Sequence, residues 1–350
     1  MQEIVFKGIA GSDKVSDGSD ARGREAEAPA WLFASATLAL MLASAIFVGW
    51  MPLQLSVVTV FLFAGPHNWM EFRYFVSRMP ARWGETRNFF QLAIGGAILL
   101  TTTYAVLPLA ARALAWEDAG WLAATAVWNS LLVGWILALV HLRSRERPRR
   151  DWSWTLPAGF ALIGLSWMMP HYWSLALVYL HPLVALWFLD RQLGKSRPRW
   201  RGAYRMCVAC LPLLVGVLWW QLADAPSFAG DDALTLRITR HAGAGLLSGV
   251  SSQLLVSTHV FLETLHYAVW LVAIPLVGLR VAPWRTERIP LVTHPRGWPR
   301  TLRALLVLGA CGVVLLWLCF LADYPTTRDI YFTAAMLHVL AEVPFLLRML

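Results

Sequence analysis

Long apolar stretches recur along the chain from Trp31 to its end, separated by short polar segments that carry most of the charged residues. Each stretch is close to the ~20 residues that an α-helix needs to cross the hydrocarbon core of a bilayer. The pattern therefore predicts an all-α fold, a polytopic membrane helix bundle with about ten transmembrane helices. The predicted spans are residues 31–50, 54–78, 90–111, 120–142, 153–170, 171–190, 203–222, 248–279, 302–322 and 329–349.

Residues 1–30 have a different character, because they are polar, mix acidic with basic side chains and hold no long apolar run. Such a segment cannot bury enough apolar surface to offset the conformational entropy lost on folding. Its acidic residues and its length also argue against a cleaved signal peptide. We therefore expect a disordered polar cytoplasmic tail over residues 1–30 and a single transmembrane helical domain over residues 31–350.

Composition and charge agree with a membrane protein and predict its orientation. Hydrophobic residues make up 58% of the chain, charged residues only 15%, and there are 20 tryptophans. Cytoplasmic loops of membrane proteins carry an excess of Lys and Arg. Ten crossings with the tail inside place 25 of the 30 basic residues on the cytoplasmic side. This predicts cytoplasmic N and C termini in a bacterial-type inner membrane. Topology and anionic lipid headgroups then explain the net charge of +9 without a nucleic-acid partner.

Three of the predicted spans each carry a histidine followed four residues later by a glutamate. An offset of four residues returns a side chain to the same face of a helix, so both members of each pair point in one direction. Ionisable groups at mid-bilayer depth are costly and normally face partners inside a bundle, so they indicate a functional site. The pairs are His67 with Glu71, His259 with Glu263, and His338 with Glu342.

Two further histidines join the candidate set. His266 follows His259 by seven residues on the same face, and Glu263 with His266 forms the Glu-x-x-His arrangement of helical di-iron and di-manganese bundles. That arrangement makes Glu263 the strongest carboxylate candidate. His181 lies near the middle of its span. The other histidines lie at predicted helix ends or in loops and rank lower. The predicted metal ligands are His67, Glu71, His181, His259, Glu263, His266, His338 and Glu342.

Imidazole and carboxylate ligands without thiolates suit iron, manganese or zinc. Eight candidates exceed what one tetrahedral zinc ion requires, so two ions are expected, with iron favoured over manganese or zinc. Iron buried where hydrophobic molecules dissolve indicates oxygen chemistry on a lipid-phase substrate such as an isoprenoid or carotenoid. The predicted activity is that of a membrane oxygenase, hydroxylase or desaturase, which would also need an electron donor or a membrane complex partner.

Short motifs on several predicted spans support one family resemblance. They are Gly65-Pro66-His67 on an early span, His181 on a later one, the two histidines of residues 248–279, and Met336-Leu337-His338 on the last span. This pattern resembles the Brp/Blh-type membrane β-carotene dioxygenases, in which histidines hold a non-haem iron that splits a polyene to retinal. The resemblance implies four iron ligands in this chain, namely His67, His181, His259 and His266.

Three other functions remain open at the level of the sequence. Histidines from facing helices could ligate haem in an electron-transfer or quinone-binding subunit, although carboxylates on the ligand faces speak against it. A transporter or proton channel would relay ions through such groups, but here they cluster at one depth instead of continuing to both faces. A structural subunit of a larger membrane complex would use them as interhelical hydrogen bonds.

Overall fold

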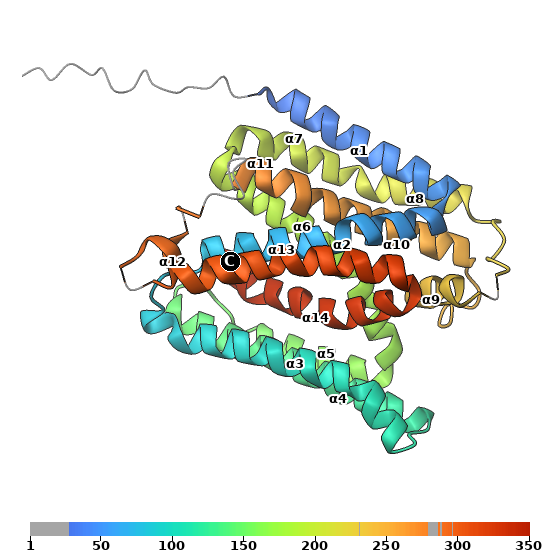
Figure 1. Ribbon diagram of the computed structural model, residues 1–350, viewed down its shortest axis with the longest axis horizontal. Coiled ribbons are helices and arrows are strands. Elements are labelled where there is room, and N and C mark those ends of the chain that lie inside the picture. The colour runs from blue at the N-terminus through green and yellow to red at the C-terminus, as the bar shows by residue number, and fades with distance from the viewer. Residues whose placement is uncertain (1–27, 231, 279–285, 288, 296) are drawn as a thin grey trace, which may run out of the picture.

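A computed structural model describes residues 28–230, 232–278, 286–287, 289–295 and 297–350. In this part of the chain every regular element is a helix, which confirms the all-α prediction. The long helices run roughly along one common direction (Figure 1). Their bounds are α1 Ala30–Trp50, α2 Pro52–Arg78, α3 Arg87–Ala113, α4 Asp118–Glu146, α5 Thr155–Met168, α6 Pro170–Ser196, α7 Pro198–Ala209, α8 Leu211–Gln221, α9 Ala233–His241, α10 Ser252–Ala268, α11 Ile274–Gly278, α12 Pro290–Thr293, α13 Pro299–Ala322 and α14 Tyr324–Met349.

Eight helical segments of the described chain are long and apolar enough to cross a bilayer, so the chain is an integral membrane helix bundle. They are α1, α3, α4, α6, the α7–α8 segment, the α10–α11 segment, α13 and α14. The two remaining predicted spans are also helical. However, α5 has only 14 residues, and α2 carries a run of polar and charged side chains in its second half. The count of ten crossings therefore stays a prediction.

The outer helices expose apolar side chains, as expected for a surface that contacts lipid. On α13, Val307 is 63% exposed, Leu315 is 61% exposed and Leu321 is 73% exposed. Such a surface would be unfavourable in water but is matched by hydrocarbon.

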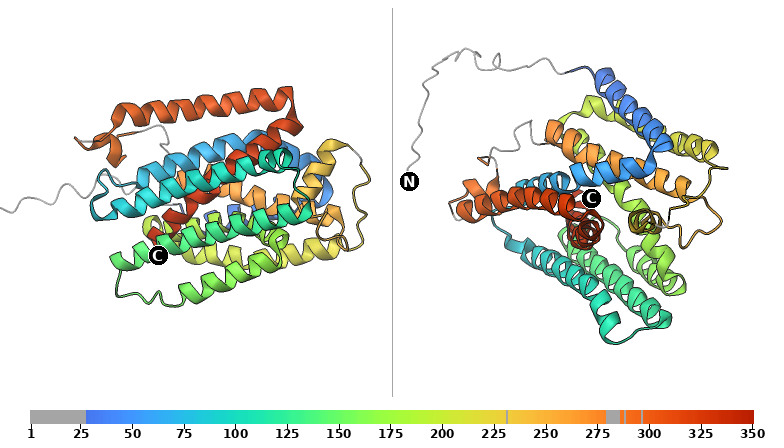
Figure 2. Two further views of the ribbon diagram at one scale, coloured as in Figure 1. Left: turned by 90° about the horizontal axis from the view of Figure 1, so that it is seen from below. Right: turned by 45° about the vertical axis from the view of Figure 1, so that its right-hand side comes forward.

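The described ends of the chain lie at the same end of the bundle (Figures 1 and 2). The Trp200 indole N–H at the start of α7 donates to the carbonyl of Ala28, while Arg143 and Arg150 donate to the carbonyls of Leu347 and Leu350. This arrangement agrees with an even number of crossings, and the cytoplasmic placement of this end stays a prediction. The predicted tail lies outside the described residues up to residue 27. The division into a tail and one helical domain also stays a prediction.

Prolines and capping side chains define where several helices begin. Pro52, Pro170 and Pro299 each occupy the first turn of a long helix, where the missing N–H has no intrahelical partner to lose. At the start of α14, the Asp323 carboxylate accepts a hydrogen bond from the backbone N–H of Thr326 at 3.1 Å. Before α2, α6 and α14 a single residue separates the helix from the one that precedes it, so these consecutive helices reverse direction tightly.

Helix α10 lies at the centre of the bundle and is buried along almost its whole length. It packs against α1, α2 and α6, and α14 packs against α2, α3 and α4. Directly after Ala268 the helix widens into a π-helical segment, Val269–Ala273, before α11. Pro275 offers no N–H to the carbonyl of Leu271, which explains the irregularity. Of the helices that carry the candidate ligands, α2 and α6 pack directly against α10, and α14 packs against α2 and α6.

The contact between α3 and α4 provides a direct test of the packing. A Cβ on Gly96 would overlap the indole of Trp135, whereas a Cβ on the neighbouring Gly95 would meet nothing within 4 Å. The Trp135 N–H is held in place by the carbonyl of Leu92 at 2.9 Å. Gly96→Ala should therefore destabilise the protein by about 1–3 kcal/mol, the usual cost of overpacking.

Thermal unfolding in detergent measures this effect, and Gly95→Ala is the matched control. The control should keep or slightly raise the midpoint, because alanine favours helix over glycine. Equal midpoints for the two variants would show that α3 and α4 do not approach each other as closely as described.

Candidate metal centre

Six of the eight predicted ligands converge in the middle of the bundle, in two overlapping groups. In each group, one ligand atom from every member lies within 4.8 Å of the corresponding atoms of the others. His266 belongs to both groups, so the two are joined. The first group is His67, Glu71, His266 and His338, and the second is His181, His266 and Glu342.

Four imidazole rings form the centre of this cluster. The ring centroid of His266 lies 5.3 Å from that of His67 and 4.6 Å from that of His181. His338 completes the set, with its ring centroid 5.1 Å from His67 and 5.2 Å from His181. The rings come from α2, α6, α10 and α14, so four separate helices must pack correctly to form the cluster.

Two carboxylates complete the ligand set. Glu71 and Glu342 each lie one turn beyond a histidine of their own helix, which is the geometry that the four-residue offset predicts. Glu342 also reaches across to α6, where its Oε2 lies 3.2 Å from Nδ1 of His181. His181 has no acidic residue one turn away on its own helix, so only the tertiary structure supplies its carboxylate.

Many polar atoms of the cluster are buried without a hydrogen-bond partner in the described part of the chain. They include both oxygens of Glu71 and both ring nitrogens of His266 and of His338. Buried polar atoms are normally satisfied, and a buried unpaired carboxylate is costly. A concentration of such nitrogen and oxygen atoms within a few ångströms is what a cation-binding site requires.

One ring orientation is fixed by a neighbouring backbone group. Nδ1 of His67 lies 3.0 Å from the carbonyl oxygen of Phe63, one turn earlier on α2. A carbonyl can only accept, so Nδ1 carries the proton and Nε2 keeps its lone pair. This is the usual way in which a protein orients a metal-binding imidazole and fixes its tautomer.

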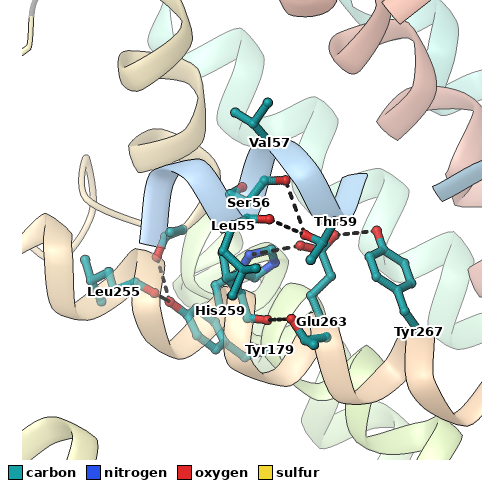
Figure 3. Close-up of polar contacts among 12 residues, drawn as sticks. Leu55, Ser56, Val57, Thr59, Tyr179, Leu255, His259, Glu263 and Tyr267 are labelled. Carbon is teal, nitrogen blue, oxygen red and sulfur yellow. Dashed lines mark hydrogen bonds and ion pairs between the residues drawn. The ribbon is translucent and has the colours of Figure 1, made fainter. Parts of the chain in front are cut away.

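His259 and Glu263 lie outside both groups, although the sequence analysis placed them in the same site. The seven-residue offset from His259 to His266 corresponds to ~10.5 Å along the helix axis, which is too far for both to bind one ion. Glu263 instead accepts a hydrogen bond from the Tyr267 hydroxyl at 2.7 Å, and its Oε2 lies 4.0 Å from Nδ1 of His259 (Figure 3). The structure therefore divides the eight predicted ligands into six that meet in the cluster and two, His259 and Glu263, that form a separate polar pair on α10.

A cavity of about 860 Å³ opens onto the imidazoles. All four histidines of the cluster line it, whereas Glu71 and Glu342 do not, so the carboxylates lie behind the rings. Ligand-binding cavities typically have roughly 300–1,000 Å³ and a mostly apolar lining with a few polar groups. A metal held here would be reached from the cavity side, as a reactive centre requires and a closed structural site does not.

Three side chains of the site were missed by the sequence analysis. The ring of Tyr267 lies 4.6 Å from that of His67, and its only sequence signal is that it follows His266. His241 lines the cavity, and its ring lies edge-on to that of His259 with the centroids 5.0 Å apart, although it ends a short helix predicted as loop. Burial lowers the pKa of His241 well below its ordinary value, with smaller contributions from His259 and Arg328. The third, Arg328, was assigned to an outer segment but is 3% exposed and lines the cavity.

Comparisons of the chain with protein-family models, curated proteins and solved structures find no match. The resemblance to the β-carotene dioxygenases therefore stays an expectation from the short motifs. Of the four ligands that it implies, His67, His181 and His266 meet in the cluster and His259 does not.

Proposed function

We propose that this protein is a membrane metalloenzyme with a non-haem centre of two metal ions, preferably iron, that acts as an oxygenase or oxidase on a hydrophobic substrate. The observation that carries the proposal is the convergence of six His and Glu side chains from four helices beside a cavity that the four imidazoles line. A structural role would not require ligand atoms grouped so closely or a cavity in front of them.

The donor set supports two ions and favours iron. Each group offers three or four nitrogen and oxygen ligands, and none of the four cysteines belongs to either group. Imidazole with carboxylate suits iron, manganese or zinc, and His/Glu ligands projecting inward from four helices are typical of di-iron and di-manganese bundles. Manganese and zinc remain the less favoured occupants.

The surroundings of the cluster favour a substrate from the lipid phase. Beside the histidines, the cavity is lined by Trp128, Leu132 and Ile136 of α4 and by Met336 and Val343 of α14. These side chains would exclude water and hold a hydrocarbon against the imidazoles. Iron, when bound, would supply the activation of dioxygen. The protein would also need an electron donor or membrane complex partner if the reaction consumes external electrons.

Isoprenoids and carotenoids are the substrate classes that the sequence motifs suggest. The positive-inside pattern supports a bacterial-type inner membrane with both termini in the cytoplasm. The reaction itself, whether hydroxylation, desaturation or cleavage of a chain, depends on which carbon the cavity presents to the metals.

Elemental analysis of detergent-purified protein tests the proposal. We expect about two iron ions per chain, in keeping with a di-iron bundle. We also expect an absorption spectrum without a Soret band, because the ligands would bind iron directly and not through a porphyrin. A metal content near zero after anaerobic purification, or an intense Soret band, would refute the non-haem centre.

A further inference from the structure

The cavity carries a second set of functional groups that the metal centre does not use. Three arginines line it near the end of the bundle where α9 and the start of α14 meet, opposite the described ends of the chain (Figure 1). Arg237 and Arg240 come from α9, and Arg328 comes from the first turns of α14. Two acidic side chains, Glu263 and Asp329, also line the cavity.

The two acidic side chains do not neutralise all of this charge. Arg237 donates from Nη1 to Asp329 Oδ2 at 2.6 Å and to the carbonyl of Pro325 at 2.9 Å, so its charge is paired with Asp329. Glu263 accepts its hydrogen bond from Tyr267. Within the described part of the chain, Arg240 and Arg328 form no ion pair within 4.0 Å, although Glu263 lies near enough to Arg328 to interact with it electrostatically over a longer distance.

Arg328 is the most informative of the three arginines. It is only 3% exposed, its guanidinium carbon lies 4.6 Å from the centre of the Phe332 ring, and its Nε has no hydrogen-bond partner among the described residues. A buried guanidinium without an anionic partner is costly, and its planar donors match carboxylates and phosphates. Arg328 thus has the properties of a residue that binds an anionic ligand inside the cavity.

The lining changes along α14 from charged to metal-binding and then to apolar. Arg328 precedes His338 by ten residues, which corresponds to ~15 Å along the helix. Phe332 and Met336 line the cavity between them, and Val339 and Val343 continue the lining beyond the histidine. A ligand that follows α14 would therefore meet the arginines first, the imidazoles next and an apolar section last.

We infer that the cavity binds a single-chain amphiphile with an anionic carboxylate or phosphate headgroup, held by Arg328 and Arg240, whose hydrocarbon chain runs along α14 past the four imidazoles. That this amphiphile is the substrate of the metal centre rests on the proposed function, whereas its binding to the cavity does not. The carbon beside the metals would lie about twelve carbon–carbon bonds from the headgroup, because an extended hydrocarbon chain advances only ~1.25 Å per bond over the ~15 Å. A hydrocarbon without a charged end would leave the arginines unused.

Binding of four defined probes to purified protein in an uncharged maltoside detergent tests the inference. The probes are hexadecanoate, hexadecyl phosphate, hexadecanol and inorganic phosphate, and the readout is tryptophan fluorescence, since Trp128 lines the cavity. Both anionic amphiphiles should bind at least ~10-fold more tightly than hexadecanol, because only they pair with the guanidinium groups. Inorganic phosphate should bind at least ~10-fold more weakly than hexadecyl phosphate, because it lacks the apolar chain.

Arginine variants test whether the preference for anionic amphiphiles arises from the guanidinium groups that line the cavity. Arg328→Gln and Arg240→Gln should each weaken binding of the anionic probes by ~10-fold or more and leave hexadecanol binding unchanged. Arg112→Gln is the matched control, because Arg112 is exposed at the end of α3 and does not line the cavity. Arg240 is exposed, so its variant keeps the test valid even if Arg328→Gln fails to fold.

Several outcomes would overturn the inference. These are equal affinity for hexadecanoate and hexadecanol, anionic binding that survives both arginine variants, and inorganic phosphate that binds as tightly as hexadecyl phosphate. Metal content measured in the same samples separates the two proposals. A loss of anion preference in metal-loaded protein refutes only the amphiphile, whereas metal-free protein that still selects anionic amphiphiles refutes only the metal centre.

Discussion

Replacing His266 with alanine is expected to remove both metal ions, so that a preparation holding about two ions per wild-type chain retains almost none. The reason is that His266 is the one residue shared by the two ligand groups. It also lies on the central helix α10, which is buried along almost its whole length. Elemental analysis of purified variants, together with their elution as single species in detergent, measures this loss.

Variants of residues that belong to one group only should have a smaller effect. His181→Ala removes a ligand of the second group, and Glu71→Gln removes a ligand of the first, so each should keep about one ion per chain. Glu263→Gln is the matched control for Glu71→Gln, because both change a buried carboxylate to an amide but Glu263 lies outside both groups. It should retain the wild-type metal content. If Glu263→Gln lost as much metal as His266→Ala, the assignment of the ligand groups would be wrong.

Removal of the metal is expected to lower the thermal midpoint of the wild-type protein strongly. The bound ions would connect α2, α6, α10 and α14, and without them the buried ring nitrogens and carboxylate oxygens lose their partners. A ligand that binds only the folded state, at 100 to 1,000 times its dissociation constant, stabilises that state by ~2.7–4.1 kcal/mol. For a chain of this size we expect a decrease of about 5–10 °C.

Thermal scans with and without a metal chelator measure this effect. The His266→Ala protein provides the control, since it should unfold at the same temperature in both conditions. A wild-type midpoint that does not respond to the chelator, in protein shown by elemental analysis to have lost its metal, would contradict a role for the ions in holding the four helices together.

The individual helices were largely predictable from the sequence. The apolar run of residues 31–50 became α1 at Ala30–Trp50, and the run of residues 302–322 became the larger part of α13 at Pro299–Ala322. Backbone groups in hydrocarbon must be satisfied within the segment, so a sufficiently long apolar run has helix as its only stable form. The span of residues 203–222 is divided between α7 and α8 at Cys210, just before Pro212 of α8, a break that hydropathy alone does not show.

Which of the three His/Glu pairs belong to the metal-ligand groups could not be predicted from the sequence. By sequence, His259 with Glu263 has the same offset as His67 with Glu71, and the Glu-x-x-His arrangement with His266 made Glu263 the stronger carboxylate candidate. The structure separates them, because α2 and α14 bring their ligands to the level of His266 and not to that of Glu263. The carboxylate of Glu263 is bound instead by the hydroxyl of Tyr267.

The sequence by itself determined that this protein is a bundle of apolar helices with paired histidines and glutamates on single faces, because both properties depend only on residues within one helix. Only the tertiary structure decided that His181 acquires the carboxylate of Glu342, that six of the eight candidates meet, and that Arg328 lies inside a cavity with them. These outcomes depend on the relative depth and rotation of helices far apart in the chain. That arrangement follows from side-chain packing between helices, which no local pattern encodes.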